Sequence, residues 1–277
     1  VRRDLQGNID IGISRSVDGG QSWEPMRIAL DMGTWGDLPE KFNGVSDACL
    51  LADTNGDVYV AGLWMYGVIN KEGKWVEGLT EESKDWNHQW RNKGSQPGFG
   101  EKQTSQFLIS KSEDDGVTWK EPVNITKSGK KEEWWLYAPG PGHGIVMDNG
   151  TLVFPTQGRN ETGETFSNIT YSSDQGKTWK SSKSAYTNTT ESMVVQLDDS
   201  SLMLNMRDNR NRKNKSDTNG RAIAVTNDMG ETWLEHKSSH GGLVEPVCMA
   251  SIHKHEYSEN GVKKSILLFS NPNSKNT

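Results

Sequence analysis

Ser172-Ser173-Asp174-Gln175-Gly176-Lys177-Thr178-Trp179 is the stretch that decides the fold, because its pattern occurs four times in the chain. The other copies are residues 16–23, 112–119 and 226–233. Each reads Ser or Thr, any residue, Asp, any residue, Gly, any residue, Ser or Thr, Trp, and each follows a short apolar segment. A motif repeated in this way predicts one structural unit used several times along the chain.

Each copy has the chemistry of a tight turn. The Asp carboxylate can accept hydrogen bonds from backbone N–H groups of its own turn, and Gly supplies a position with positive φ. The hydroxyl group closes the loop, and the Trp has a large apolar face to bury. The pattern therefore predicts a β-hairpin turn that is held by its own side chains and anchored by a tryptophan.

The spacing of the copies suggests their place in a larger repeat. Their Asp residues, Asp18, Asp114, Asp174 and Asp228, are separated by 96, 60 and 54 residues. The two shorter intervals are near the length of one β-propeller blade, and the first is near two. We therefore expect that one copy has been lost between Asp18 and Asp114.

The rest of the chain also reads as strands. Ile9, Ile11 and Ile13 alternate with small or polar residues, which is the period of a strand with one buried face. Further hairpins are predicted around the turns at residues 54–56 and 148–150. No segment keeps a 3.6-residue period, so the sequence predicts an all-β protein, and its many short strands favour a β-propeller over a sandwich.

One segment, residues 65–104, breaks the strand pattern. It contains Trp75, Trp86 and Trp90 among Gly, Lys and Glu residues, and it is long for a connection. Two interpretations are open: a lid or rim at a site, or a small satellite core beneath the loop.

Composition excludes several classes of function. The chain of 277 residues has a net charge of −6 and no basic block, so neither nucleic acid nor an anionic membrane is expected as a partner. The two cysteines, Cys49 and Cys248, are predicted to be buried free thiols. The six His residues show no metal-ligand spacing, and no apolar run could span a membrane, so we expect no metal, no cofactor and no membrane insertion.

The two ends of the sequence read as interior positions of a longer chain. There is no initiator Met and no signal peptide, and the last residues, 274–277, form a polar loop pattern. We expect the chain to be incomplete at both ends.

The four copies resemble the Asp boxes of the sialidase (neuraminidase) family, and the order of the other segments is similar to that of bacterial exo-α-sialidases. This resemblance implies a six-bladed β-propeller in which residues 1–277 form part of a single catalytic domain. Six blades at a spacing of 54 to 60 residues need more residues than the chain has, so about one blade is expected to be missing. The boxes themselves are interpreted as turn staples far from any site.

The family's chemistry indicates which residues to look for. Its substrate carries a carboxylate on the anomeric carbon, which would repel a carboxylate nucleophile, so sialidases use Tyr instead. A Glu takes the Tyr proton, an Asp acts as acid and then base on the leaving oxygen, and three Arg hold the substrate carboxylate. The resemblance therefore implies sialylated glycans as partners and a secreted or periplasmic location.

Two segments resemble those that carry the Glu and the second Arg. Thr-Asn-Thr-Thr-Glu at residues 187–191 implies that Glu191 is the general base, and Asn-Met-Arg-Asp-Asn-Arg at residues 205–210 implies that Arg207 binds the carboxylate. A predicted hairpin between them would bring both residues to the same end of adjacent strands. The alternative is an ordinary ion pair at the rim.

Three further matches imply other site residues. Val-Arg-Arg-Asp-Leu-Gln at residues 1–6 makes Asp4 the acid/base and Arg2 a contact to the sugar, although the family usually has more residues between that Arg and that Asp. Asn-Gly-Val-Ser-Asp at residues 43–47 makes Asp47 a hydrogen-bond partner of a ring hydroxyl. The alternatives are a solvated Asp4 near the terminus and an Asp47 that caps its own turn. Gln157 matches a position that faces the glycerol side chain of the sugar.

The first Arg, the third Arg and the nucleophilic Tyr have no match among these residues. We therefore expect them outside the 277 residues. The resemblance implies a retaining, metal-independent exo-α-sialidase. Two alternatives stay open: a trans-sialidase of the same fold, and a non-catalytic propeller that binds sialoglycans.

Overall fold

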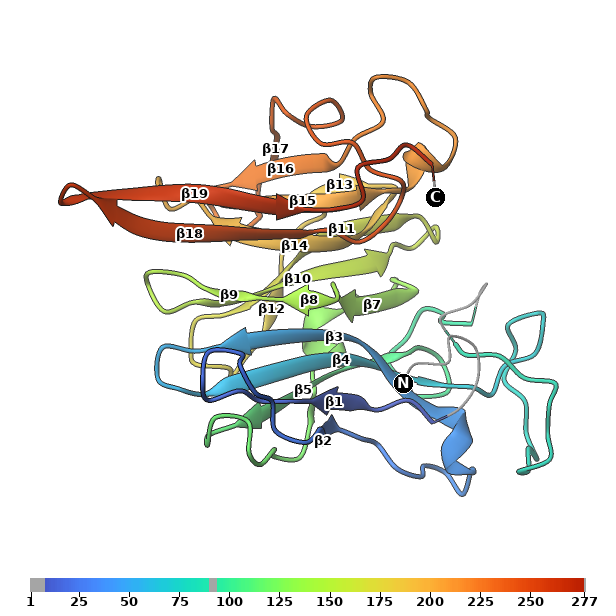
Figure 1. Ribbon diagram of the computed structural model, residues 1–277. Helices are drawn as coiled ribbons and strands as arrows, with labels where there is room; N and C mark the ends of the chain where they lie inside the picture. The colour runs from blue at the N-terminus through green and yellow to red at the C-terminus, as the bar shows by residue number, and fades with distance from the viewer. Residues whose placement is uncertain (1–7, 90–93, 277) are drawn as a thin grey trace. The chain divides into compact units, whose positions relative to one another are not determined.

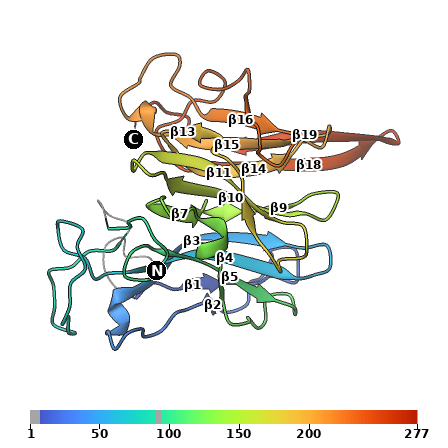
Figure 2. The same ribbon diagram turned by 180° about the vertical axis from the view of Figure 1, so that it is seen from behind.

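The computed structural model describes residues 8–89 and 94–276. The chain divides into two compact units, Val1–Pro139 and Gly140–Thr277. Figures 1 and 2 show that both units are built from antiparallel strands joined by hairpins. The helical segments of the described residues have three or four residues each, so the all-β prediction is confirmed.

The elements of the first unit are β1 (Ile11–Ile13), β2 (Arg27–Leu30), η1 (Glu40–Phe42), β3 (Asn43–Ala52), β4 (Val58–Tyr66), β5 (Gln106–Ser112), β6 (Val123–Asn124), α1 (Thr126–Gly129) and β7 (Leu136–Pro139). Those of the second unit are β8 (Gly142–His143), β9 (Ile145–Val146), β10 (Leu152–Arg159), β11 (Thr165–Ser172), β12 (Lys180–Ser181), β13 (Tyr186–Thr187), β14 (Thr189–Gln196), β15 (Leu202–Asp208), η2 (Asn209–Arg212), β16 (Ala222–Thr226), β17 (Leu234–Glu235), β18 (Ser251–Glu259) and β19 (Val262–Ser270).

Two of the sheets contain a meander in which each strand pairs with the next along the chain. The first unit has the run β3, β4, β5, β6, and the second has the run β14, β15, β16, β17. In both runs the repeated motif begins at the last residue of the third strand and ends before the fourth: residues 112–119 lead from β5 to β6, and residues 226–233 lead from β16 to β17. The motif therefore marks one corner of a repeated four-stranded sheet.

This placement corrects the expectation of a lost copy. The long interval between Asp18 and Asp114 holds β2 and then the first three strands of a single meander. The additional length comes from the connection between β4 and β5, which runs from residue 67 to residue 105. One sheet with a long loop, rather than two sheets, fills the interval.

The predicted turn geometry is confirmed in all four copies. In the third, Thr178 donates from its N–H to Asp174 Oδ1 (2.8 Å) and from its hydroxyl to Asp174 Oδ2 (2.6 Å). Ser172 donates to the same carboxylate (2.7 Å) and accepts from Gly176 N (2.9 Å). The other three copies repeat these contacts within 0.1 Å. The hydroxyl and backbone hydrogen bonds lower the pKa of each box Asp to about 2.

A substitution in one box tests this electrostatic account. Thr178→Val removes the hydroxyl that lowers the pKa of Asp174 most, so we expect that pKa to rise toward its ordinary value of 3.8. Because the folded pKa is the lower one, ionised Asp174 stabilises the fold above pH 4, and the benefit is lost as the pH falls toward 2. The variant should therefore begin acid unfolding at a higher pH. An NMR titration of the Asp174 carboxyl measures the shift, with Thr232→Val in another box as control; an Asp174 pKa that stays at about 2 would contradict it.

The tryptophan anchor is present in only some copies. Trp179 is buried and packs against Phe154, with a ring-centroid distance of 5.4 Å. Trp119 and Trp233 are half-buried, but Trp23 is 64% exposed. The prediction of a buried anchor is therefore wrong for the first box, whose hairpin β1–β2 forms a two-stranded sheet by itself among the described residues.

The long connection between β4 and β5 adds aromatic side chains to the core of the first unit. Trp86 is buried and packs edge-on against Phe42 at 4.9 Å. Trp75 lies 5.9 Å from Tyr66 and 6.2 Å from Trp35. Trp86 shares one core with Val60 and Leu108, so the segment packs on the main core and does not form a separate satellite core. Its role as a lid or rim stays a prediction, and Trp90 lies outside the described residues.

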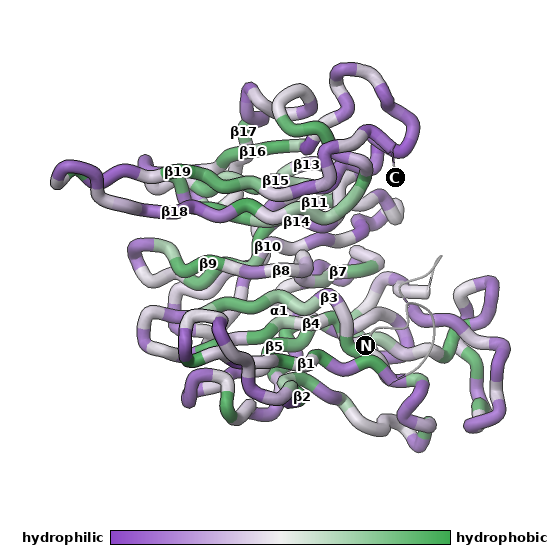
Figure 3. Tube along the Cα trace, in the orientation of Figure 1, coloured by the Kyte–Doolittle hydropathy of each residue, from purple (hydrophilic) through white to green (hydrophobic). Residues whose placement is uncertain are grey.

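The meander of β14, β15 and β16 is apolar on both faces. Val194, Leu204 and Met206 belong to the core on one face, whereas Met193, Met203 and Ile223 belong to the core on the other. Figure 3 shows the central strands as hydrophobic and the connecting loops as mainly hydrophilic. Polar residues buried at one end of this sheet therefore need a separate explanation.

Candidate active site

Glu191 lies at a β-bulge near the start of β14. Thr189 pairs with Asp208 and Ser192 pairs with Met206, so two residues of β14, Thr190 and Glu191, oppose Arg207 alone. A bulge re-aims side chains locally, and bulges are common beside active sites. Nothing in the strand pattern of the sequence predicted this extra residue.

The bulge brings the two predicted residues of the hairpin together. Arg207 Nη1 donates to Glu191 Oε2 at 2.5 Å, and each side chain is about one-fifth exposed, at 22% and 23%. The Nε atom of Arg207 is buried and has no hydrogen-bond partner among the described residues. The prediction that the hairpin would place Glu191 and Arg207 side by side is confirmed; their roles stay predictions.

A side chain of β11 makes a hydrogen bond to the bulge in β14. Ser167 of β11 donates from Oγ to Thr190 O at 2.5 Å. Gln157 of β10 pairs directly with Ser167, so its half-buried side chain is on the same face of that sheet. Gln157 therefore lies on the face of the β10–β11 pair from which Ser167 contacts β14.

Gly140 also packs against this bulge. A Cβ atom at Gly140 would lie 2.7 Å from Ser192 O and 3.2 Å from Ser192 N, both of which are backbone atoms of β14. Because backbone cannot rotate away as a side chain can, only glycine fits here.

Gly140→Ala should destabilise the fold. We expect the clash with Ser192 to lower the free energy of unfolding by about 1–3 kcal/mol, the usual cost of overpacking. Chemical denaturation measures it. Gly241→Ala is the matched control, since a Cβ at Gly241 meets nothing within 4 Å. Equal stability of the two variants would contradict the close approach.

A charged pair that sequence reasoning missed contacts β15 next to Arg207. Arg221 and Glu245 are both fully buried, with Arg221 Nη1 3.4 Å from Glu245 Oε2. Burial lowers the pKa of Arg221 to about 10, so the guanidinium stays charged at neutral pH. Little in the sequence indicated this pair, because neither residue lies in a segment that resembles the sialidase family.

A second polar group occupies the opposite face of the sheet. Asp208 accepts from Arg210 Nε at 2.7 Å and lies 3.1 Å from His240 Nδ1. The other ring nitrogen of His240 is 3.2 Å from the Tyr186 hydroxyl, and the Arg210 guanidinium lies 4.6 Å from the Tyr186 ring centroid. This group braces the end of β15 directly after Arg207.

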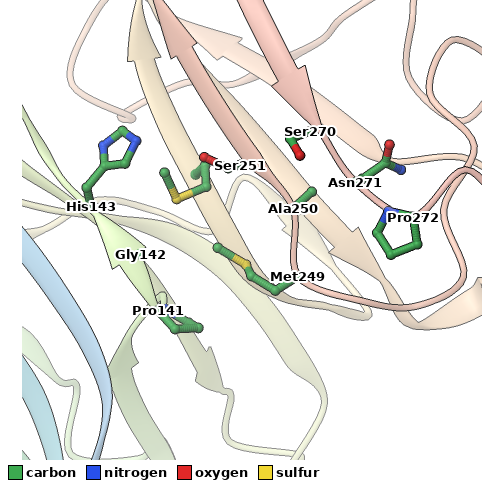
Figure 4. Close-up of a pocket in the computed structure, with 10 residues that line it drawn as sticks. Pro141, Gly142, His143, Met249, Ala250, Ser251, Ser270, Asn271 and Pro272 are labelled. Carbon is green, nitrogen blue, oxygen red and sulfur yellow. The ribbon is translucent and has the colours of Figure 1, made fainter. Parts of the chain in front are cut away.

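A cleft of about 470 Å³ opens on the same side of the sheet as Arg207. Met193 lines it and packs in one core with Met203, and side chains alternate along β15 from Met203 to Arg207. Figure 4 shows the cleft with His143 on one side and Asn271 and Pro272 on the other. Its lining residues are Pro141, Gly142, His143, Met193, Met249, Ala250, Ser251, Ser270, Asn271 and Pro272.

The other predicted site residues belong to the first unit. Asp47 of β3 is half-buried, with φ of 55°, at a second bulge between Ser46 and Cys49. Thus Asp47 and Glu191 both occupy bulges in the first strand of a meander. Arg2 and Asp4 lie outside the described residues.

The described residues contain no group of three or more His, Cys, Asp or Glu side chains placed to bind a metal ion. In that same part of the chain, every helix is too short and too polar to cross a membrane.

The sequence matches a known protein family. The pattern of the BNR repeat-like domain family matches residues 2–277. The chain belongs to this family.

A sialidase of Bacteroides fragilis is 43% identical over 271 residues, which are 98% of this chain and 45% of the relative. A sialidase of Clostridium perfringens is 28% identical over 249 residues, covering 85% of this chain and 55% of the relative. This BNR repeat-like chain therefore spans about half the length of the curated relatives it matches.

Solved structures give the same result for the fold. A Hadza microbial sialidase aligns over 98% of this chain and 48% of its own, with a TM-score of 0.83 and 40% identity. The sialidase of Trypanosoma rangeli in complex with sialic acid aligns over 95% of this chain and 39% of its own, with a TM-score of 0.66 and 22% identity. These relatives are β-propellers, which agrees with the meander sheets of both units. The number of six blades stays a prediction.

Proposed function

We propose that the protein is a retaining exo-α-sialidase that releases terminal sialic acid from glycoconjugates. The observation that carries this proposal is the Glu191–Arg207 pair, held at a β-bulge on the side of the sheet where the cleft opens. The 43% identity to a sialidase over nearly the whole chain supports the same class of reaction.

Arg207 would bind the carboxylate of the substrate. A guanidinium matches a carboxylate with two parallel N–H donors, and such charge-assisted contacts are stronger than neutral ones. Arg207 donates to Glu191 through Nη1, and its buried Nε has no hydrogen-bond partner among the described residues. An unpaired buried donor is costly, so a bound carboxylate would stabilise this side chain.

Glu191 would act as the base for a tyrosine nucleophile. The tyrosine oxygen bonds to the anomeric carbon as the glycosidic bond breaks, its proton passes to Glu191, and Asp4 protonates the leaving oxygen. Water then attacks the same carbon with the proton transfers reversed, so the sugar leaves with retained configuration. We expect the tyrosine in a part of the protein outside these 277 residues.

The remaining predicted residues would orient the sugar. Asp47 would accept a hydrogen bond from a ring hydroxyl, Gln157 would face the glycerol side chain, and Arg2 would contact the sugar next to Asp4. Asp47 and Gln157 are half-buried, so each keeps some exposed surface that can meet a ligand. We also propose a secreted or periplasmic location, which cell fractionation would test.

The test is release of sialic acid from an aryl α-sialoside by the full-length protein, followed by NMR of the first product. Initial formation of the α-anomer supports a retaining sialidase. Release of the β-anomer would overturn the retaining mechanism. Transfer to an acceptor sugar in place of water would identify a trans-sialidase. Binding without turnover would identify a sialoglycan-binding propeller and overturn the enzyme proposal.

A further inference from the structure

Arg221 and Glu245 form an ion pair that is difficult to explain by stability alone. Both side chains are fully buried within the second unit. Removing two charges from water costs about as much as their attraction returns, so apolar residues of similar volume could replace such a pair at no loss of stability. A buried pair retained in this situation suggests a positioning role.

The contacts of the pair flank Arg207 on both sides. Arg221 Nε donates to Asn205 Oδ1 at 2.6 Å, and its Nη2 lies 3.3 Å from Asn205 O. Glu245 Oε1 accepts from the backbone N–H of Asp208 at 2.8 Å. The pair therefore holds β15 two residues before Arg207 and one residue after it.

The same pair reaches the loop that lines the cleft. Arg221 Nη1 donates to Cys248 O at 2.7 Å, directly before the lining residues Met249 and Ala250. Val247 in this loop is buried and has φ of 63°, a rare backbone conformation for a β-branched residue. Such strain persists only where the surroundings hold it, and Arg221 and Glu245 provide contacts at both ends of this short segment.

The buried Arg221 also interacts electrostatically with the two charged residues of the candidate site. The charges of Glu191 and Arg207 both act on the Arg221 guanidinium, after burial and Glu245, which have the larger effects. The buried cation is therefore near enough to the candidate site to interact with both of its charged residues.

We propose that Arg221 and Glu245 are positioning residues that lock Arg207 in register with the strained cleft loop at residues 246–250, so that its guanidinium meets the ligand carboxylate in the bidentate orientation. This inference rests on the proposed function of Arg207 and adds residues that do not themselves touch the ligand. Misplacement of a reacting or binding group by about 1 Å can cost roughly 100-fold in rate.

The test uses Arg221→Met combined with Glu245→Gln in the full-length protein. This double variant removes both charges together, so no buried charge is left unpaired, and the new side-chain amide oxygen can still accept from the Asp208 N–H. Thermal unfolding and circular dichroism establish that it folds. If it does not fold, Arg221→Lys, which keeps a buried cation opposite Glu245 but loses the guanidinium contacts to Asn205 and Cys248, takes its place in the same measurements.

The readout is discrimination between sialic acid and its methyl ester, which lacks the charged carboxylate. We expect the wild type to prefer the acid and the variant to lose roughly 10- to 100-fold of its affinity for the acid, with little change for the ester. A merely structural role would weaken both ligands equally. An unchanged ratio of the two affinities in a folded variant would overturn the proposal.

A double-mutant cycle with Arg207→Ala provides the second readout. If the buried pair acts through Arg207, Arg207→Ala should cost much less in the double variant than in the wild type. Additive losses would overturn the positioning role and leave the proposed function intact. A wild type that binds neither ligand would instead overturn the proposed function, and this inference with it.

Discussion

Glu191→Gln should lower kcat for release from an aryl α-sialoside by about 10²- to 10⁴-fold, the usual contribution of a general base. Gln keeps the shape of Glu and an oxygen that can accept from Arg207 Nη1, so the ion pair is replaced by a hydrogen bond. It cannot take a proton from tyrosine at neutral pH. We therefore expect KM and the affinity for sialic acid to change much less than kcat.

The matched control is Glu231→Gln, the same substitution at a side chain of the second unit that is 66% exposed. Its turnover should equal that of the wild type. Wild-type turnover by a folded Glu191→Gln variant would rule out Glu191 as the base. A loss of ligand affinity as large as the loss of turnover would point to a positioning role for Glu191 instead.

Arg207→Ala should weaken the binding of sialic acid by about 1.5–3 kcal/mol, which is roughly 10- to 150-fold in Kd. The substitution removes a charge-assisted contact to the ligand carboxylate. It also leaves Glu191 without its partner, and this like charge would face the ligand. Isothermal titration calorimetry of the full-length protein measures the change.

Arg212→Ala provides the control for Arg207→Ala, because Arg212 is an exposed arginine a few residues further along the chain, at the end of η2. We expect its affinity for sialic acid to match that of the wild type. If Arg207→Ala folds and binds as the wild type does, the carboxylate site is elsewhere and the proposed assignment fails.

The sequence predicted those parts of the fold in which the interacting residues lie close together along the chain. The turns of all four boxes were predicted correctly, since the Asp, Gly and hydroxyl groups that form each turn lie within seven residues of one another. The Trp23 anchor was predicted wrongly because its burial depends on packing from other elements. The expected lost copy was also wrong, since spacing alone does not separate a further sheet from a long loop whose aromatic side chains pack into the existing core.

The candidate site divides in the same way. The sequence by itself determined the all-β meander and the hairpin that brings Glu191 beside Arg207, because strand periodicity and turn chemistry are local properties. Only the tertiary structure decided that a bulge aims Glu191 at Arg207, that Gly140 packs on this bulge, and that a buried Arg221–Glu245 pair contacts β15 on both sides of Arg207. The reason is physical: these features depend on contacts between residues 16 to 52 positions apart, which short-range patterns do not encode.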